Sequence, residues 1–77
     1  METNKVLKTE FFAGVEIKTR EKDTLYTKYF KIKNNNEVLE KKITVSCVSV
    51  PRFEVFKLIH ENIHKYIKEN FSNYQLI

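Results

Sequence analysis

The chain has 77 residues, of which 42% are hydrophobic and 31% charged, with one Gly, one Pro, one Cys and a formal net charge of +4. A chain this short forms one small domain without room for a deep catalytic cleft, so we expect no enzyme, no catalytic residues and no cofactor. One cysteine excludes an internal disulfide and no apolar run is long enough for a membrane span, so the sequence predicts a cytoplasmic protein without membrane contacts.

The first predicted strand runs from Phe11 to about Arg20, where apolar and polar residues alternate. The residues expected on its buried face are Phe11, Ala13, Val15 and Ile17. Because this pattern continues on both sides of Gly14, the glycine predicts a bulge or bend inside the strand. The polar residues 19–23 then form the first connection.

The second predicted strand covers residues 25–33, and its inward side chains are Tyr26, Phe30 and Ile32. Lys28 interrupts this inward set, so its amine must reach solvent or lie at an edge. The run Asn34–Glu37 predicts a turn, because Asn tolerates left-handed backbone. A third strand follows over residues 39–50, with Ile43, Val45 and Cys47 on one face. Short connections between three strands predict an antiparallel meander.

A helix is predicted from Arg52 to about Asn70, preceded by Pro51 and capped by Ser49 or Val50. Its expected apolar stripe consists of Phe56, Ile59, Ile63 and Ile67, with Phe53, Tyr66 and Phe71 at the margins.

The predicted fold class is thus α+β, a three-stranded antiparallel meander sheet packed on one C-terminal amphipathic helix (β-β-β-α) in two layers. Residues 1–77 form a single domain, with the sheet in 1–50, the helix in 51–71 and a tail in 72–77. The tail either docks along the sheet edge or stays free for a partner.

The segment "HENIH" matches the H-E-x-x-H pattern of zinc proteases, with His60 and His64 one helical turn apart. A zinc site also needs a third protein ligand, for which the chain offers only Glu, Asp or its one cysteine, Cys47. We expect His60 to pack toward the apolar stripe and Cys47 to be a buried, inert thiol. The sequence therefore predicts no metal site, with His60, His64 and Cys47 as the candidate ligands.

The sheet face that the helix leaves bare is expected to be basic. Its candidate nucleic-acid-binding residues are Lys18, Arg20, Tyr29, Lys31, Lys33 and Lys42. Such a face could lie on phosphates or enter a major groove, as β-sheet DNA-binding proteins do. The alternative is that these lysines only keep the sheet in water and discourage edge pairing.

Several apolar residues have no obvious place in the core, and exposed apolar clusters tend to mark protein contacts. The candidate protein-binding residues are Phe12, Leu25, Val55, Leu58, Leu76 and Ile77. We therefore expect a non-catalytic protein that acts by protein–protein contact, as a regulator or inhibitor of a host complex. The chain is rich in Lys, Asn and Ile, which hints at an AT-rich genome and favours a phage or another mobile element as its source.

Self-association is also expected, because a three-stranded meander has two open edges and this chain has few residues that block them. A small core gains from an added interface. The sequence predicts a homodimer with two-fold symmetry, formed edge to edge or through Val55, Leu58 and the tail.

Overall fold

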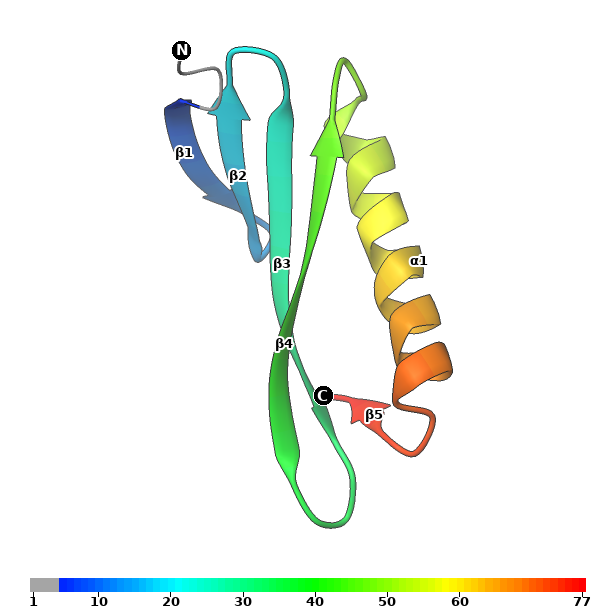
Figure 1. The fold of residues 1–77 in the computed structure, drawn as a ribbon. Helices are drawn as coiled ribbons and strands as arrows, with labels where there is room; N and C mark the ends of the chain where they lie inside the picture. Colours follow the sequence, from blue (N-terminus) through cyan, green and yellow to red (C-terminus); the bar gives the residue numbers. More distant parts are fainter. Residues whose placement is uncertain (1–4) are drawn as a thin grey trace.

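The structure, a computed structural model, describes residues 5–77 as a twisted sheet with one helix lying along it (Figure 1). The elements are β1 (Val6–Phe12), β2 (Val15–Arg20), β3 (Thr24–Lys33), β4 (Val38–Cys47), α1 (Arg52–Asn70) and β5 (Gln75–Leu76). The antiparallel order is β1-β2-β3-β4, and β5 pairs with β3. The predicted α+β class with a C-terminal helix is confirmed. Residues 1–4 of the predicted domain lie outside the described residues.

The predicted three-stranded sheet is wrong. The first predicted strand, residues 11–20, spans the end of β1, a turn and β2, and residues 6–10, which were not predicted as strand, complete β1. The chain reverses at Ala13 and Gly14, which have φ angles of 52° and 77°, and Phe12 pairs directly with Val15. Positive φ at both central residues is what a two-residue type I′ hairpin turn requires. A Cβ added at Gly14 would lie 2.8 Å from the Lys28 amine. Gly14 therefore occupies a hairpin turn, not the predicted bulge.

The reversal also changes which side chains share a face. Phe11 pairs with Glu16, and Glu10 pairs with Ile17. Since directly opposite residues point to the same side of a sheet, Phe11 lies on the open face while Ile17 faces the helix. The open face is the sheet side that carries Phe11 and Glu16, and the helix face is the other.

The turn between β3 and β4 is confirmed at Asn34–Glu37. The Asn34 side-chain oxygen accepts hydrogen bonds from the backbone N–H groups of Asn36 at 2.8 Å and Glu37 at 2.9 Å. Ten residue pairs join β3 to β4 without a shift in register. Asn at the first turn position thus fixes the connection by bonding to its own backbone.

The predicted stripe of α1 is confirmed at Ile59, Ile63 and Ile67, but it is rotated at its start, where Val55 is buried and Phe56 only half-buried. The buried residues are Val55, Ile59, Ile63 and Ile67, and Phe53 is 80% exposed. Steps of four residues keep these branched side chains on one side of the helix. The placement of Val55 off the stripe and of Phe53 at its margin was therefore wrong. Pro51 occupies the N-cap without a side-chain cap, in place of the predicted Ser49 or Val50.

The core lies between the helix face of the sheet and this stripe. Its nine buried hydrophobic residues are Val15, Ile17, Tyr26, Phe30, Ile32, Val55, Ile59, Ile63 and Ile67. Lys28 is half-buried on the helix face, and its amine reaches out beside the hairpin turn. The central strand β3 supplies three core residues, Tyr26, Phe30 and Ile32. The core therefore depends most on the pairing of β3 with β2 and β4.

The C-terminal tail docks along the sheet edge, which is one of the two predicted outcomes. Ile77 donates its backbone N–H to the Lys31 carbonyl at 3.0 Å. The Tyr74 hydroxyl donates to the Glu37 carboxylate, and this bond raises the pKa of Tyr74. The Tyr74 ring also packs edge-on against Phe71, with 5.3 Å between centroids. Figure 1 shows β5 folding back beside the lower half of β3.

The described molecule is elongated, with Cα extents of 46 × 22 × 22 Å and a radius of gyration of 14.3 Å. A compact domain of this length would have about 11.5 Å. The shape follows from the long β3–β4 ribbon, which α1 covers on one face only. Much of the sheet surface is therefore free for contacts.

Candidate functional site

The edge of β3 that faces β2 is interrupted in its middle. On this edge β2 pairs with Thr24 to Lys28 and β5 pairs with Ile32 and Lys33, while β4 occupies the opposite edge along the whole strand. Tyr29 and Lys31 present their backbone groups to the same side, because N–H and C=O directions alternate along a strand. The Lys31 carbonyl is bonded to Ile77. The N–H and C=O of Tyr29 have no strand partner on this edge among the described residues.

A groove of about 590 Å³ lies at this interruption, within the size range of ligand sites. It runs between the tip of the β1–β2 hairpin and β5. Its lining residues are Ala13, Val15, Lys28, Tyr29, Phe30, Lys31, Phe56, Ile59, His60, Ile63, Leu76 and Ile77. Its floor is apolar, because its most buried lining residues are Phe30, Ile59 and Ile63, each at most 7% exposed.

The polar side chains of the groove are mostly bases. Lys28, Lys31 and His60 lie on its walls, Tyr29 adds a hydroxyl, and no lining side chain in the described part of the chain is a carboxylate. An apolar floor beneath a basic rim suits a ligand with an apolar group next to a negative charge. The unpaired Tyr29 backbone adds a donor and an acceptor for an extended main chain.

The predicted protein-binding residues are scattered around this groove. Leu76 and Ile77 line it, and Phe12 stacks on the groove residue Phe56 with 5.7 Å between ring centroids. Leu58 is 43% exposed on α1, outside the groove lining. Leu25 pairs with Lys18 and so lies half-buried on the open face. Val55, at 0% exposed, is a core residue and not part of any surface.

The predicted nucleic-acid-binding residues do share one face. The pairing of β2, β3 and β4 places Lys18, Arg20, Tyr29, Lys31, Lys33 and Lys42 together on the open face. Acidic side chains lie on the same face. Asp23 binds Arg20, and Glu40 is the cross-strand neighbour of Lys31. The face is therefore less basic than the count of lysines and arginines suggests.

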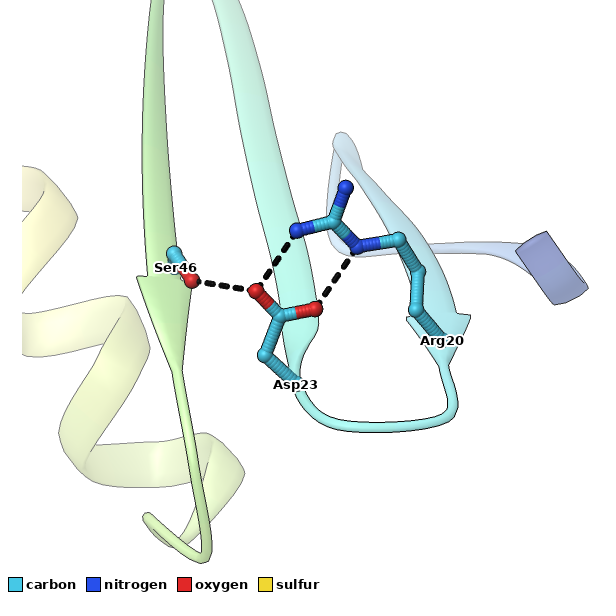
Figure 2. Close-up of polar contacts among 3 residues, drawn as sticks. All are labelled: Arg20, Asp23 and Ser46. Carbon is cyan, nitrogen blue, oxygen red and sulfur yellow. Dashed lines mark hydrogen bonds and ion pairs between the residues drawn. The ribbon is translucent and has the colours of Figure 1, made fainter. Parts of the chain in front are cut away.

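Arg20, Asp23 and Ser46 form a small polar network at one end of this face (Figure 2). The Arg20 guanidinium donates two hydrogen bonds of 2.6 Å to the Asp23 carboxylate, and the Ser46 hydroxyl donates a third at 2.8 Å. The bond from Arg20, followed by that from Ser46, lowers the pKa of Asp23 from 3.8 to about 2. The network ties the β2–β3 connection to β4.

We expect this network to make the stability acid-sensitive. A carboxyl whose pKa is lower in the folded state stabilises the fold fully above its unfolded pKa, and this contribution is lost as pH falls. For Asp23 the loss falls between about pH 4 and pH 2. NMR titration of Asp23, which is the one Asp in the sequence, checks the value directly. Asp23→Asn should be less stable than the wild type at pH 7.

The control for this comparison is Glu21→Gln, an exposed neighbour in the same connection. The stability difference between wild type and Asp23→Asn should shrink toward pH 2, while the difference for Glu21→Gln stays small throughout. An Asp23 titration near pH 4, with equal stabilities at neutral pH, would contradict the assignment.

The candidate metal ligands do not come together. His60 and His64 are both exposed on α1 with 4.4 Å between ring centroids, so His60 does not pack into the core as predicted. Cys47 is only half-buried at the end of β4, not buried as predicted, because it lies on the sheet's outermost strand, where the core ends. Within residues 5–77, no group of three or more His, Cys, Asp or Glu side chains could hold a metal ion.

A second hollow, of similar volume, lies at the β3–β4 turn. It is lined by Lys33, Asn34, Asn35, Asn36, Asn73 and Gln75. The Asn34 oxygen is already bonded within the turn. Its lining has no counterpart of the apolar side chains Phe30, Ile59 and Ile63 that form the floor of the groove beside β3.

Comparison with protein families, with curated proteins and with solved structures finds no match for this chain. The one helix of the described residues is not long and apolar enough to cross a membrane.

Sequence reasoning missed the groove because its parts are distant in the chain. The sequence pattern predicts Phe30, Ile59 and Ile63 only as core residues. They are core residues, but they also line the groove because no strand of residues 5–77 covers the middle of β3 there. Ala13 was assigned to a continuous strand. The dipeptide Ala13-Gly14 between two alternating segments was the signal for a hairpin whose tip could wall a groove.

Proposed function

We propose that this protein is a small non-catalytic binding protein that acts by protein–protein contact. It captures a short extended segment of its partner in the groove beside β3. The observation that carries the proposal is the unpaired backbone of Tyr29 above the apolar floor of Phe30, Ile59 and Ile63. Addition of a segment to an open strand is a common way for proteins to bind peptides.

The chemistry of the groove limits the segment. About three residues of β3 separate the pairs formed with β2 and β5, which is roughly 10 Å of strand. The occupant is therefore a few residues long, with an apolar side chain for the floor and a carboxylate for Lys28, Lys31 or His60. The proposal keeps the role expected from the sequence, a regulator or inhibitor of a host complex encoded by a phage or mobile element.

Self-association belongs to the proposal as well. Among residues 5–77, the outer edges of β1 and β4 are unpaired and lie at the two ends of the sheet order, away from the groove, so a homodimer formed edge to edge leaves both grooves accessible.

The binding test is an NMR titration with a capped pentapeptide, Gly-Glu-Ile-Glu-Gly. We expect the largest amide shift changes at Tyr29, Lys31 and Ile77. Lys31→Glu should weaken binding by at least about tenfold, since it places a like charge beside the ligand and tenfold corresponds to about 1.4 kcal/mol. The matched control is Lys22→Glu in the β2–β3 connection, which should bind normally.

The same titration with Gly-Lys-Ile-Lys-Gly should give little binding. Equal shifts with both peptides, or shifts that map elsewhere, would contradict the groove.

The alternative is a nucleic-acid-binding protein that uses the open face, and the shared placement of its six candidate residues favours it. Titration with mixed-sequence DNA at low salt separates the two. Binding that weakens steeply with salt and is reduced by Lys33→Ala or Lys42→Ala would favour this alternative, because phosphate contacts release counterions.

A further inference from the structure

The outer edge of β4 is the longest regular strand edge that the described residues leave unpaired. All ten residues of β4 pair with β3, without a bulge, and no other strand in residues 5–77 pairs with β4. The strand has no proline. The opposite end of the sheet is better protected, since the register of β1 shifts between Val6 and Lys8. Bulges, prolines and inward charges are what normally prevent edge pairing.

Lys41 is a charged residue of β4 whose side chain points to the helix face, and its amine is held by an aromatic ring. It lies opposite Phe30 on the helix face, and its amine lies 4.9 Å from the centroid of the Phe71 ring. Because this amine is held over an aromatic ring, it does not project from the edge of β4, where a charge would discourage pairing with another strand.

The direction of the backbone groups on this edge follows from β3. The Lys31 carbonyl points toward β5, so alternate residues of β3, including Lys28, point toward β4. Lys28 pairs with Ile43, which therefore points its N–H and C=O back at β3. Lys42 and Thr44 consequently present theirs to the free edge.

The helix face beside this edge is incompletely covered. Ile43 and Val45 on β4 are only half-buried, although Ile17 and Tyr26 on the neighbouring strands are buried on the same face. Leu58 of α1 is 43% exposed. At about 100° per residue, Leu58 lies on the flank of α1 opposite to that of the groove residue His60, and so on the β4 side.

We propose that a second copy of this chain pairs with the free edge of β4, antiparallel and about a two-fold axis that passes beside Ile43. This inference rests on the self-association included in the proposed function and is independent of the groove. The pairing joins the two five-stranded sheets into one and brings half-buried apolar residues of both copies together across the axis.

The charges on β4 favour the register centred on Ile43. Side chains keep their faces only when the two strands shift by an even number of residues. Among such registers, two pair nine of the ten β4 residues. The one centred on Lys42 sets that lysine opposite its own copy, which is destabilising. The one centred on Ile43 pairs residues 39–47, with Lys42 opposite Thr44, Glu40 opposite Ser46 and Lys41 opposite Val45.

The first test is the mass in solution by sedimentation over a range of protein concentrations. The wild type should reach twice the chain mass of 9.3 kDa. Lys42→Pro should stay at 9.3 kDa, because it removes an N–H that faces the free edge and leaves the ladder with β3 intact. Lys42→Ala keeps that N–H and should still dimerise. Circular dichroism checks that Lys42→Pro is folded.

The second test fixes the axis. In a Cys47→Ser background, Ile43→Cys should form a disulfide-linked dimer on mild oxidation, because directly opposite non-hydrogen-bonded residues have Cα atoms about 4.5 Å apart. Lys31→Cys, on an inner strand, should not. A wild-type monomer at high micromolar concentration, or dimers of folded Lys42→Pro, would overturn the proposal. Pentapeptide binding by monomeric Lys42→Pro reports on the groove separately.

Discussion

Val55→Asp is expected to unfold the domain at pH 7. Val55 is 0% exposed and belongs to the core stripe of α1. A carboxylate there would have no partner among the apolar residues around it, and an uncompensated buried charge costs about 3–5 kcal/mol. A chain of this length has a total stability of only roughly 4–12 kcal/mol. Circular dichroism and thermal unfolding measure the loss.

The matched control is Phe53→Asp, two residues earlier in the same helix. Phe53 is 80% exposed, so this change should alter the stability by less than about 0.5 kcal/mol. The pair tests the rotation of α1, because the sequence pattern placed Phe53 at the margin of the stripe and Val55 off it. Equal stability losses in the two variants would show that the helix is rotated differently.

Ile32→Ala is expected to cost about 2–5 kcal/mol of unfolding free energy, from lost burial and the cavity left behind. Ile32 is 0% exposed and pairs with Leu39 on β4 and with Leu76 on β5. Neighbours on both sides of β3 limit how far the site can collapse. Urea unfolding at one fixed protein concentration gives the value, since any dimer makes stability depend on concentration.

Ile77→Ala serves as the control for that measurement, because Ile77 has the same side chain and is 65% exposed. It should cost less than about 1 kcal/mol. A loss at Ile32 no larger than the loss at Ile77 would contradict the burial of Ile32 in the core.

The architecture was largely predictable where periodicity was long and uninterrupted. The alternation in β3 and β4, the Asn34 turn and the helical span of α1 were all visible in the sequence. The failures came at short-range ambiguities. Gly14 is compatible with both a bulge and a turn. The choice of a bulge joined the end of β1 to β2 as one strand and left residues 6–10 unassigned.

The helix stripe illustrates a second limit. Phe53 and Phe56 are the more hydrophobic anchors by size, yet Val55 is the buried residue of that turn. Burial is decided by the rotation that also accommodates Ile59, Ile63 and Ile67, so the tertiary contact outweighs the local pattern. The groove could not be predicted at all, because it exists only where the hairpin tip, the middle of β3 and the tail meet.

The contact between β3 and β5 also has a kinetic side. Ile32 and Leu76 lie 44 positions apart, whereas the β3–β4 ribbon closes through a four-residue turn. Local pairs form early and distant ones late, since closing a long loop costs more entropy. With only two paired residues, β5 should be the last strand to join and the first to leave by sub-global opening. One wall of the groove would then open and close while the rest of the domain stays folded, so that capture of a segment would be coupled to the final step of folding.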